Sequence, residues 1–350
     1  MLDGFSEERF RYYRDIKALQ SKIEEHVKVD RKKLIQFAQE IAEKELRVPN
    51  WGPPYFPNFP PENNEIFLRH LLIGNALNFC YTEPSHEKFA VSWTPPGEEE
   101  EQLFVGSKGM WAALSRAYKD GLDIYSGRVL KNLTIKDVKH IFRTDAGPLP
   151  LISKRWANLV DVGSYLHLLD IGNMSLGDIL DVYGDAKFIL NFLKSSMTVA
   201  YGMDGINTHK VYSSGSVPFR YIHFDKRARL FVVMYEGRAR SSEGELETLE
   251  GLDAIGPITD YQVPKIFRHF GVLKYSNELS HKVDNKIELP EYSLEEFALR
   301  AATYIATEEL YYALRYIRDE DISMVELDYL LWSQGRRAEG EHHITLTDNY

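Results

Sequence analysis

Residues 6–45, SEERFRYYRDIKALQSKIEEHVKVDRKKLIQFAQEIAEKE, are the stretch that most clearly sets the fold class. Its apolar residues recur at intervals of three and four, at Phe10, Ile16, Leu19, Ile23, Val27, Leu34, Phe37 and Ile41. This spacing gathers them on one face of a helix. We therefore predict an amphipathic helix here, interrupted near Val29 and Asp30.

The rest of the chain carries mostly helical patterns. Helices are predicted at residues 66–79, 109–120, 135–143, 151–171, 179–201, 264–272, 293–317 and 321–332. Two short strands are predicted at 90–93 and 102–105, around the turn Pro95-Pro96-Gly97. Six prolines set among aromatic residues predict an ordered loop over 49–61. Residues 202–215 are predicted to be a polar loop, 220–235 helix or strand, and 246–259 helix or turn.

These patterns predict a mainly α fold with a minor β element. We expect a single domain over residues 1–350, with a small β insert near 88–106. The net charge of −10 argues against a partner that is a nucleic acid polymer, because such proteins normally carry a basic surface. The charged N-terminus and the lack of long apolar runs predict no membrane partner and a cytoplasmic location.

Metal and cofactor signatures are missing from the sequence. Cys80 is the only cysteine, so an intrachain disulfide and a cysteine-based zinc site are excluded. No phosphate-binding Walker loop, dinucleotide-binding glycine pattern, His-Glu-x-x-His helix or Gly-x-Ser-x-Gly elbow occurs. His342 and His343 lie in a polar tail. We expect neither a metal nor a cofactor.

Three segments carry candidate chemistry, and each has a simpler structural interpretation. Asp260 precedes the helix that contains Pro264, where it either caps the helix or places a carboxylate against developing positive charge. Lys226 and Arg227 either start a solvated helix or bind a phosphate. Asp328, four residues before Trp332, is either a surface acid or a reader of a base edge. The residues alone leave these alternatives open.

Several motifs in register resemble the queuosine salvage protein family, known as queuosine 5′-phosphate N-glycosylase/hydrolase. Each is weak alone, but together they cover nearly the whole chain in the family's order. The matching stretches are residues 76–79 (ALNF), 109–114 (GMWAAL), 225–228 (DKRA), 259–264 (TDYQVP), 271–276 (GVLKYS) and 327–332 (LDYLLW).

The resemblance implies a helical fold related to helix-hairpin-helix DNA glycosylases. It also implies release of the base queuine from queuosine 5′-monophosphate, or from the nucleoside queuosine, without a cofactor. Asp260 then matches the catalytic carboxylate. Asp328, Tyr329 and Ile258 match positions of the base pocket, and Lys226 matches a basic position near the ribose phosphate.

Further residues complete the predicted pocket. Arg227 is assigned beside Lys226 to the 5′-phosphate. Phe79 and Trp111 are candidates for stacking on the base, with a role in the core as the alternative. The sequence also departs from the family: Ser333 replaces a second acid of some members, and Tyr55 or Phe56 replaces a pocket histidine.

Two other functions remain open from the sequence. A glycosylase that excises bases from nucleic acid would share the fold but would need a basic surface. A non-catalytic carrier of queuine or its nucleoside would use the same pocket. Hydrolysis builds oxocarbenium character on the ribose, and Asp260 is predicted to stabilise that charge or to orient the attacking water.

Overall fold

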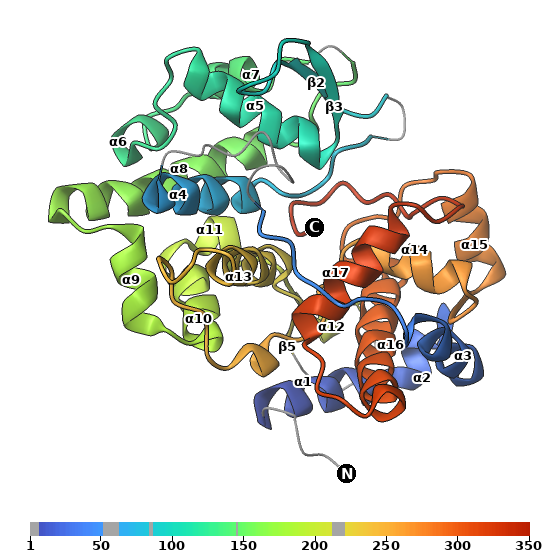
Figure 1. Ribbon diagram of the computed structural model, residues 1–350. Helices are drawn as coiled ribbons and strands as arrows, with labels where there is room; N and C mark the ends of the chain where they lie inside the picture. The colour runs from blue at the N-terminus through green and yellow to red at the C-terminus, as the bar shows by residue number, and fades with distance from the viewer. Residues whose placement is uncertain (1–6, 52–62, 84–86, 145, 212–220) are drawn as a thin grey trace. The chain divides into compact units, whose positions relative to one another are not determined.

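The computed structural model describes residues 7–51, 63–83, 87–144, 146–211 and 221–350, which are mainly helical (Figure 1). They form two compact units, each assembled from separate stretches of the chain. Unit 1 is drawn from residues 1–48, 204–226 and 251–346, and unit 2 from 49–203, 227–250 and 347–350. The organisation as a single domain stays a prediction.

Unit 1 is built from helices and two pairs of short antiparallel strands, β1 with β6 and β4 with β5. Its elements are α1 (Glu7–Lys17), α2 (Gln20–Ile23), β1 (Val27–Val29), α3 (Arg31–Ile41), β4 (Gly205–Asn207), α12 (Thr208–Val211), β5 (Tyr221–His223), the 3-10 helix η1 (Leu252–Ala254), α14 (Gln262–His269), β6 (Leu273–Tyr275), α15 (Asn277–Asp284), α16 (Leu294–Arg318) and α17 (Met324–Gly335).

The core of unit 1 lies around α16, which packs against α1, α3 and α14. Ser293 caps the start of α16 by accepting the Glu296 N–H at 3.2 Å. Beyond its last turn Asp319 takes a left-handed conformation, with φ 52°. In Figure 1, α14 and α17 lie side by side. Their close approach requires Gly335, because a Cβ there would lie 2.4 Å from the Gln262 carbonyl oxygen.

The N-terminal stretch is only partly helical as predicted. The interruption at Asp30 is confirmed: its carboxylate accepts the Lys33 N–H at 3.1 Å and caps α3. The prediction of helix at Val27 is wrong, because residues 27–29 form β1 and pair with β6, Val27 opposite Tyr275. The helix predicted at 293–317 is confirmed as α16, and that at 321–332 as α17.

One loop prediction needs correction, and two open alternatives are resolved. Residues 202–215 are not simply a polar loop, because β4 and α12 lie within them. For residues 246–259 the prediction was helix or turn, and the turn is found as the 3-10 turn η1. In 220–235 both alternatives occur: β5 is followed by α13 (Lys226–Ala239), whose first residue belongs to unit 1 and whose remainder belongs to unit 2.

Unit 2 is mainly helical with one hairpin. Besides α13 its elements are α4 (Asn64–Ala76), β2 (Ala90–Trp93), β3 (Gln102–Val105), α5 (Ser107–Lys119), α6 (Gly127–Leu130), α7 (Ile135–Ile141), α8 (Ile152–Gly172), α9 (Leu176–Tyr183), α10 (Ala186–Ser196) and α11 (Thr198–Tyr201). The predicted strands 90–93 and 102–105 are confirmed and pair antiparallel.

Helix α8 organises unit 2 and packs against α4, α6, α7 and α11. Two glycines allow its close contact with α6. A Cβ on Gly127 would lie 2.0 Å from the backbone nitrogen of His167, and a Cβ on Gly163 would lie 2.4 Å from the backbone nitrogen of Lys131. Any side chain at either position would push the two helices apart.

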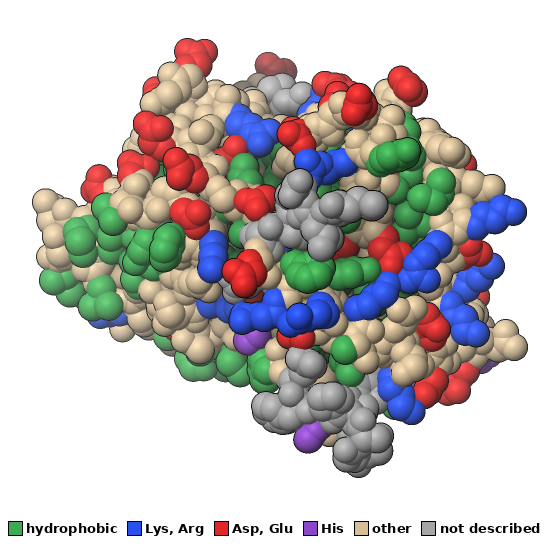
Figure 2. Space-filling view, turned by 90° about the horizontal axis from the view of Figure 1, so that it is seen from below, with side chains coloured by type: hydrophobic (Ala, Val, Ile, Leu, Met, Phe, Trp, Pro, Cys, Tyr) green, Lys and Arg blue, Asp and Glu red, His purple; other side chains and the backbone are tan. Residues whose placement is uncertain are grey.

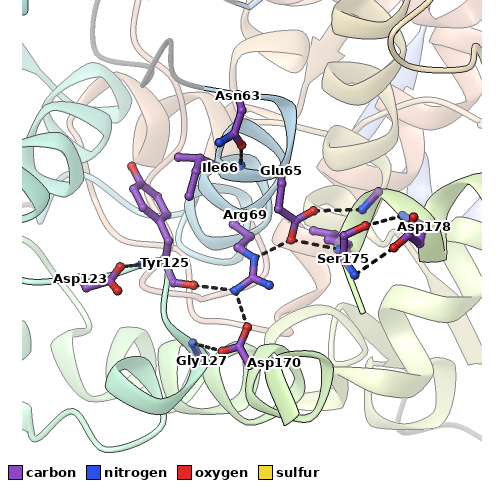
Figure 3. Close-up of polar contacts among 12 residues, drawn as sticks. Asn63, Glu65, Ile66, Arg69, Asp123, Tyr125, Gly127, Asp170, Ser175 and Asp178 are labelled. Atoms are coloured by element: carbon purple, nitrogen blue, oxygen red, sulfur yellow. Dashed lines mark hydrogen bonds and ion pairs between the residues drawn. The ribbon is translucent and has the colours of Figure 1, made fainter. Parts of the chain in front are cut away.

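A polar network joins α4, α8 and α9 within unit 2 (Figure 3). Arg69 donates to Glu65 at 2.6 Å, to Asp170 at 2.8 Å and to the Tyr125 carbonyl oxygen at 2.9 Å. The Glu65 carboxylate also accepts the N–H groups of Leu176 and Gly177 at 3.0 and 3.1 Å. One carboxylate therefore both pairs with an arginine and satisfies the N-terminus of α9.

Unit 2 also exposes apolar side chains. In Figure 2 hydrophobic side chains gather at the left of the face shown, the side on which Figure 1 draws α8, α9 and α10. Exposed residues on these helices include Ile171, Val182 and Phe188, at 70%, 82% and 60%. None of the helices in the described residues is long and apolar enough to cross a membrane.

Candidate functional site

Asp260 lies in unit 1, just before α14. Its carboxylate Oδ1 accepts the Gln262 N–H at 3.0 Å, and its Oδ2 lies 3.4 Å from the Lys226 Nζ. The formal cap residue is Tyr261, which makes no side-chain cap bond. Asp260 therefore makes the predicted cap bond, although it stands one residue before the formal cap position. The same carboxylate also forms a buried ion pair with Lys226.

Lys226 and Arg227 do not start a solvated helix. Their exposed fractions are 2% and 1%, so the simpler interpretation of this segment is wrong. Asp225, directly before them, has a φ of 51°, a left-handed conformation that is uncommon for a residue other than glycine. This turn directs the backbone from β5 into α13 and begins the helix at Lys226.

Asp328 is also buried, so it is not a surface acid of α17. Its Oδ1 accepts the Ile258 N–H at 3.3 Å. The bond joins α17 to the segment that leads into Asp260. Tyr329 is half-buried, and its ring centre lies 6.1 Å from that of Trp332. Ser333, at the position of the missing second acid, donates its hydroxyl to the Leu330 carbonyl oxygen at 2.9 Å.

The structure thus brings four predicted residues together within unit 1: Lys226, Ile258, Asp260 and Asp328. A carboxylate beside an ammonium can stabilise positive charge on a substrate while the ammonium binds an anionic group. Asp328 adds a second carboxylate, which can accept hydrogen bonds from a base.

Sequence reasoning missed Asp204, which bonds to Lys226, and Arg300, which binds Asp204. Arg300, in α16, donates to both carboxylate oxygens of Asp204 at 2.7 and 2.8 Å. Asp204 Oδ2 also accepts the Lys226 backbone N–H at 2.8 Å. The signal for Arg300 was its spacing of four residues from Glu296 and its place as the one charged residue of 297–307, a stretch of α16 in which a buried charge needs a partner.

Another residue near this group is held neutral. Burial, followed by the charges of His342 and Arg300, lowers the pKa of His343 to about 3. Its ring therefore carries no positive charge at neutral pH. His343 is only 4% exposed, so it is buried even though the sequence around it is polar.

Phe79, Trp111 and Arg227 belong to unit 2. Phe79 is fully buried, with the guanidinium carbons of Arg155 and Arg227 4.1 and 5.3 Å from its ring centre. Arg227 also donates to the Ala76 carbonyl oxygen at 3.0 Å. These contacts are those of a packed interior, and a role in binding stays a prediction.

Trp111 packs against α4 within unit 2. A Cβ on Gly74 would lie 1.7 Å from the indole ring, and the His70 ring centre lies 5.1 Å away. These contacts belong to the core, so stacking of Trp111 on a base stays a prediction. Tyr55 and Phe56, the other predicted pocket residues, lie outside the described residues. In the described part of the chain no group of three or more His, Cys, Asp or Glu side chains could hold a metal ion.

Comparison with known proteins identifies a shared family. The family model described as queuosine salvage protein matches residues 59–349, a range that includes Lys226, Asp260 and Asp328 and begins after Tyr55. Relatives named queuosine 5′-phosphate N-glycosylase/hydrolase are 26% identical in Sphaerobacter thermophilus, over 88% of this chain and 87% of that protein. In Dictyostelium discoideum the identity is 24%, over 96% of this chain and 98% of the relative. In Bos taurus it is 25%, over 83% and 82%.

Proposed function

This chain belongs to the queuosine salvage protein family, and on that premise we propose that it hydrolyses the N-glycosidic bond of queuosine 5′-phosphate. Water adds to the ribose C1′ as the bond from C1′ to the base nitrogen breaks. The departing base takes up a proton, and the products are queuine and ribose 5-phosphate. Queuosine itself is a second candidate substrate.

The observation that supports this function is the buried pair of Lys226 and Asp260. As the glycosidic bond breaks, positive charge develops on the ribose, and a nearby carboxylate stabilises it by roughly several kcal/mol. The Asp260 carboxylate is oriented for this by the Gln262 N–H. The Lys226 ammonium, 3.4 Å away, is a suitable donor to the ribose phosphate.

Asp328 is the proposed reader of the base. Its orientation is set by the bond from the Ile258 N–H, two residues before Asp260. A carboxylate at this position accepts hydrogen bonds from the amino and imino edge of a guanine-like base. This recognition matters because a 7-deazaguanine lacks the N7 atom that ordinary purines can protonate before leaving. Tyr329 and Ile258 belong to the same proposed pocket.

Other parts of the proposal rest on the family resemblance. We assign Arg227 to the phosphate, and Tyr55, Phe79 and Trp111 to the base, as proposals about unit 2. We also propose that the chain works as one hydrolase domain related to helix-hairpin-helix DNA glycosylases and acts in the cytoplasm. A small nucleotide rather than a nucleic acid polymer is the proposed substrate, in line with the net charge of −10.

The function is tested by incubating the protein with queuosine 5′-monophosphate and following free queuine by liquid chromatography with mass detection. Asp260→Asn retains the side-chain oxygen that accepts the Gln262 N–H but removes the charge. We expect kcat to fall by about a thousandfold or more. Asp30→Asn is the matched control: Asp30 also accepts a backbone N–H at a helix start in unit 1, and its substitution should preserve turnover.

The outcomes separate the candidate functions. Turnover that survives Asp260→Asn within about tenfold would contradict the role of Asp260 but not the activity. Binding of nucleotide by the wild type without release of queuine would favour the carrier. Excision of a base from an oligonucleotide, with no release from the nucleotide, would favour the nucleic-acid glycosylase.

A further inference from the structure

Asp204 holds the start of α13 through both its side chain and its backbone. The carboxylate accepts the Lys226 N–H at 2.8 Å. The Asp204 carbonyl oxygen accepts the N–H groups of Phe224 and Asp225 at 3.0 and 3.3 Å. One residue therefore bonds to three consecutive amides, and the middle one belongs to Asp225 with its left-handed φ of 51°. The unusual turn that places Lys226 is maintained by these bonds.

Arg300 connects that turn to the segment carrying Asp260. Its two terminal nitrogens bind both oxygens of Asp204, and its Nε donates to the Thr259 hydroxyl at 3.3 Å. Thr259 is the residue directly before Asp260. The same guanidinium lies 4.1 Å from the ring centre of Phe224, on the other segment. A single planar group thus contacts Thr259, which is next to Asp260, and Asp204, which bonds to the Lys226 backbone.

We propose that Asp204 and Arg300 are positioning residues that set the separation of Lys226 from Asp260. This inference rests on the proposed function. The bidentate geometry fixes the guanidinium in one orientation, so the turn before Lys226 and the segment before Asp260 share one rigid reference. Glu296, 3.9 Å from Arg300 and one turn earlier in α16, supplies a second negative charge beside the guanidinium.

A positioning role would account for the burial of the Arg300–Asp204 ion pair. Removing two charges from water offsets much of their attraction, so a buried pair is weak evidence for a role in stability. Unit 1 contains a matched example: Arg9 binds Glu308 through two bonds of 2.8 and 2.7 Å, and both side chains are buried. That pair joins α1 to α16, and Arg9 also donates to the Asp253 carbonyl oxygen at 3.1 Å, seven residues before Asp260.

The two pairs allow a controlled experiment. Arg300→Lys keeps the positive charge but loses the planar fork that reaches Asp204 and Thr259 together. Asp204→Asn keeps an oxygen for the Lys226 N–H but loses the charge that binds Arg300. Arg9→Lys makes the same chemical change as Arg300→Lys in a pair distant in sequence from the site residues. Thermal unfolding of each variant records the accompanying loss of stability.

Turnover of queuosine 5′-monophosphate is the first readout. We expect Arg300→Lys and Asp204→Asn to lower kcat by about tenfold or more with KM changed by less than about threefold, since the group that orients the reacting carboxylate is disturbed. Arg9→Lys should leave kcat unchanged. A wild-type kcat in both site variants, or a rise in KM alone, would overturn the proposal. So would an equal fall of kcat in Arg9→Lys.

The second readout does not require activity. Lys226 is 2% exposed, so brief acetylation of the folded protein, quantified by peptide mass spectrometry, should modify it slowly. Its modification should be at least about fivefold faster in both site variants than in the wild type and Arg9→Lys, because the turn that buries it is released. Unchanged modification would overturn the proposal. A wild type without turnover would reject the proposed function, while this labelling would still decide whether Asp204 and Arg300 hold Lys226.

Discussion

Two buried arginines of unit 1 and one buried arginine of unit 2 are compensated in different ways. In unit 1, Arg9 and Arg300 each form two bonds to a carboxylate, Glu308 and Asp204 respectively. In unit 2, Arg155 is fully buried and donates to the backbone oxygens of Pro150, Leu77, Phe79 and Cys80, with Phe79 against its guanidinium.

This difference changes the electrostatics of the two interiors. Burial alone lowers the pKa of Arg9, but the hydrogen bond and charge of Glu308 raise it above its ordinary value. Burial lowers the pKa of Arg155 to about 10, because neutral carbonyl groups compensate less for lost hydration than a carboxylate does. Arg9 and Arg300 of unit 1 are therefore compensated by carboxylates, and the same unit contains the buried pair of Lys226 and Asp260.

The largest predicted effect tests the charge pairing of unit 1. Arg9→Met leaves Glu308 buried without its guanidinium, and we expect a loss of about 3–5 kcal/mol in the free energy of unfolding. Hydrogen exchange of α16 peptides, measured by mass spectrometry, should report this loss. The double variant Arg9→Met/Glu308→Leu should recover most of it, because both charges are then gone. A double variant as unstable as the single one would show that the pair is not the source.

In unit 2, Arg155→Met should lower stability less than Arg9→Met does, and removing a nearby carboxylate should not restore the lost stability. Arg155→Met removes donors from several buried carbonyl oxygens, and we expect a loss of about 2–4 kcal/mol, read from hydrogen exchange of α8 peptides. Asp348 is the carboxylate whose charge acts on Arg155. Adding Asp348→Asn to Arg155→Met should not restore stability. Recovery would mean that Arg155 is compensated by charge, and the contrast between the units would fail.

Elements with strong local signals were predicted well from the sequence. The helix expected at 293–317 is found at 294–318, because its start is capped by Ser293 and no glycine or proline interrupts it. The hairpin strands at 90–93 and 102–105 were also predicted, since their partners are close in sequence. By contrast, Val27 was predicted as helix, because its partner strand β6 lies more than two hundred residues away and leaves no local trace in the sequence.

In the candidate site, too, residues with a local sequence signal were predicted and residues that depend on distant partners were missed. The sequence proposed Asp260, Asp328 and Lys226, and the structure shows that all three are buried in unit 1. Asp204 and Arg300 were missed because a lone acid in a polar segment and an arginine in a helix are usually solvated. Their pairing spans 96 residues of sequence, so only the folded chain reveals it.

Acid should lower the stability of both units to a similar degree. The contrast between the units is therefore expected for the buried arginines and not for the buried histidines. Burial lowers the pKa of His70 in unit 2 to about 3, and the pKa of His343 in unit 1 is lowered to the same value. Each ring stays neutral in the folded protein, while the unfolded chain takes up a proton below its ordinary pKa of about 6.5. The stability that depends on a neutral ring is therefore complete above that pH and is lost as the pH falls toward 3.

For a ring with these two pKa values, the loss between pH 8 and pH 5 is roughly 2 kcal/mol. Urea unfolding of the wild type, His70→Gln and His343→Gln at several pH values in this range measures it. Each variant should lose less stability on acidification than the wild type by about that amount, whatever its stability at pH 8. If only His343→Gln flattens the pH dependence, acid sensitivity would belong to unit 1 alone, and the contrast between the units would extend to histidine. If neither variant does so, the two rings take up protons without unfolding, and the neutral state inferred for His343 beside Arg300 is wrong.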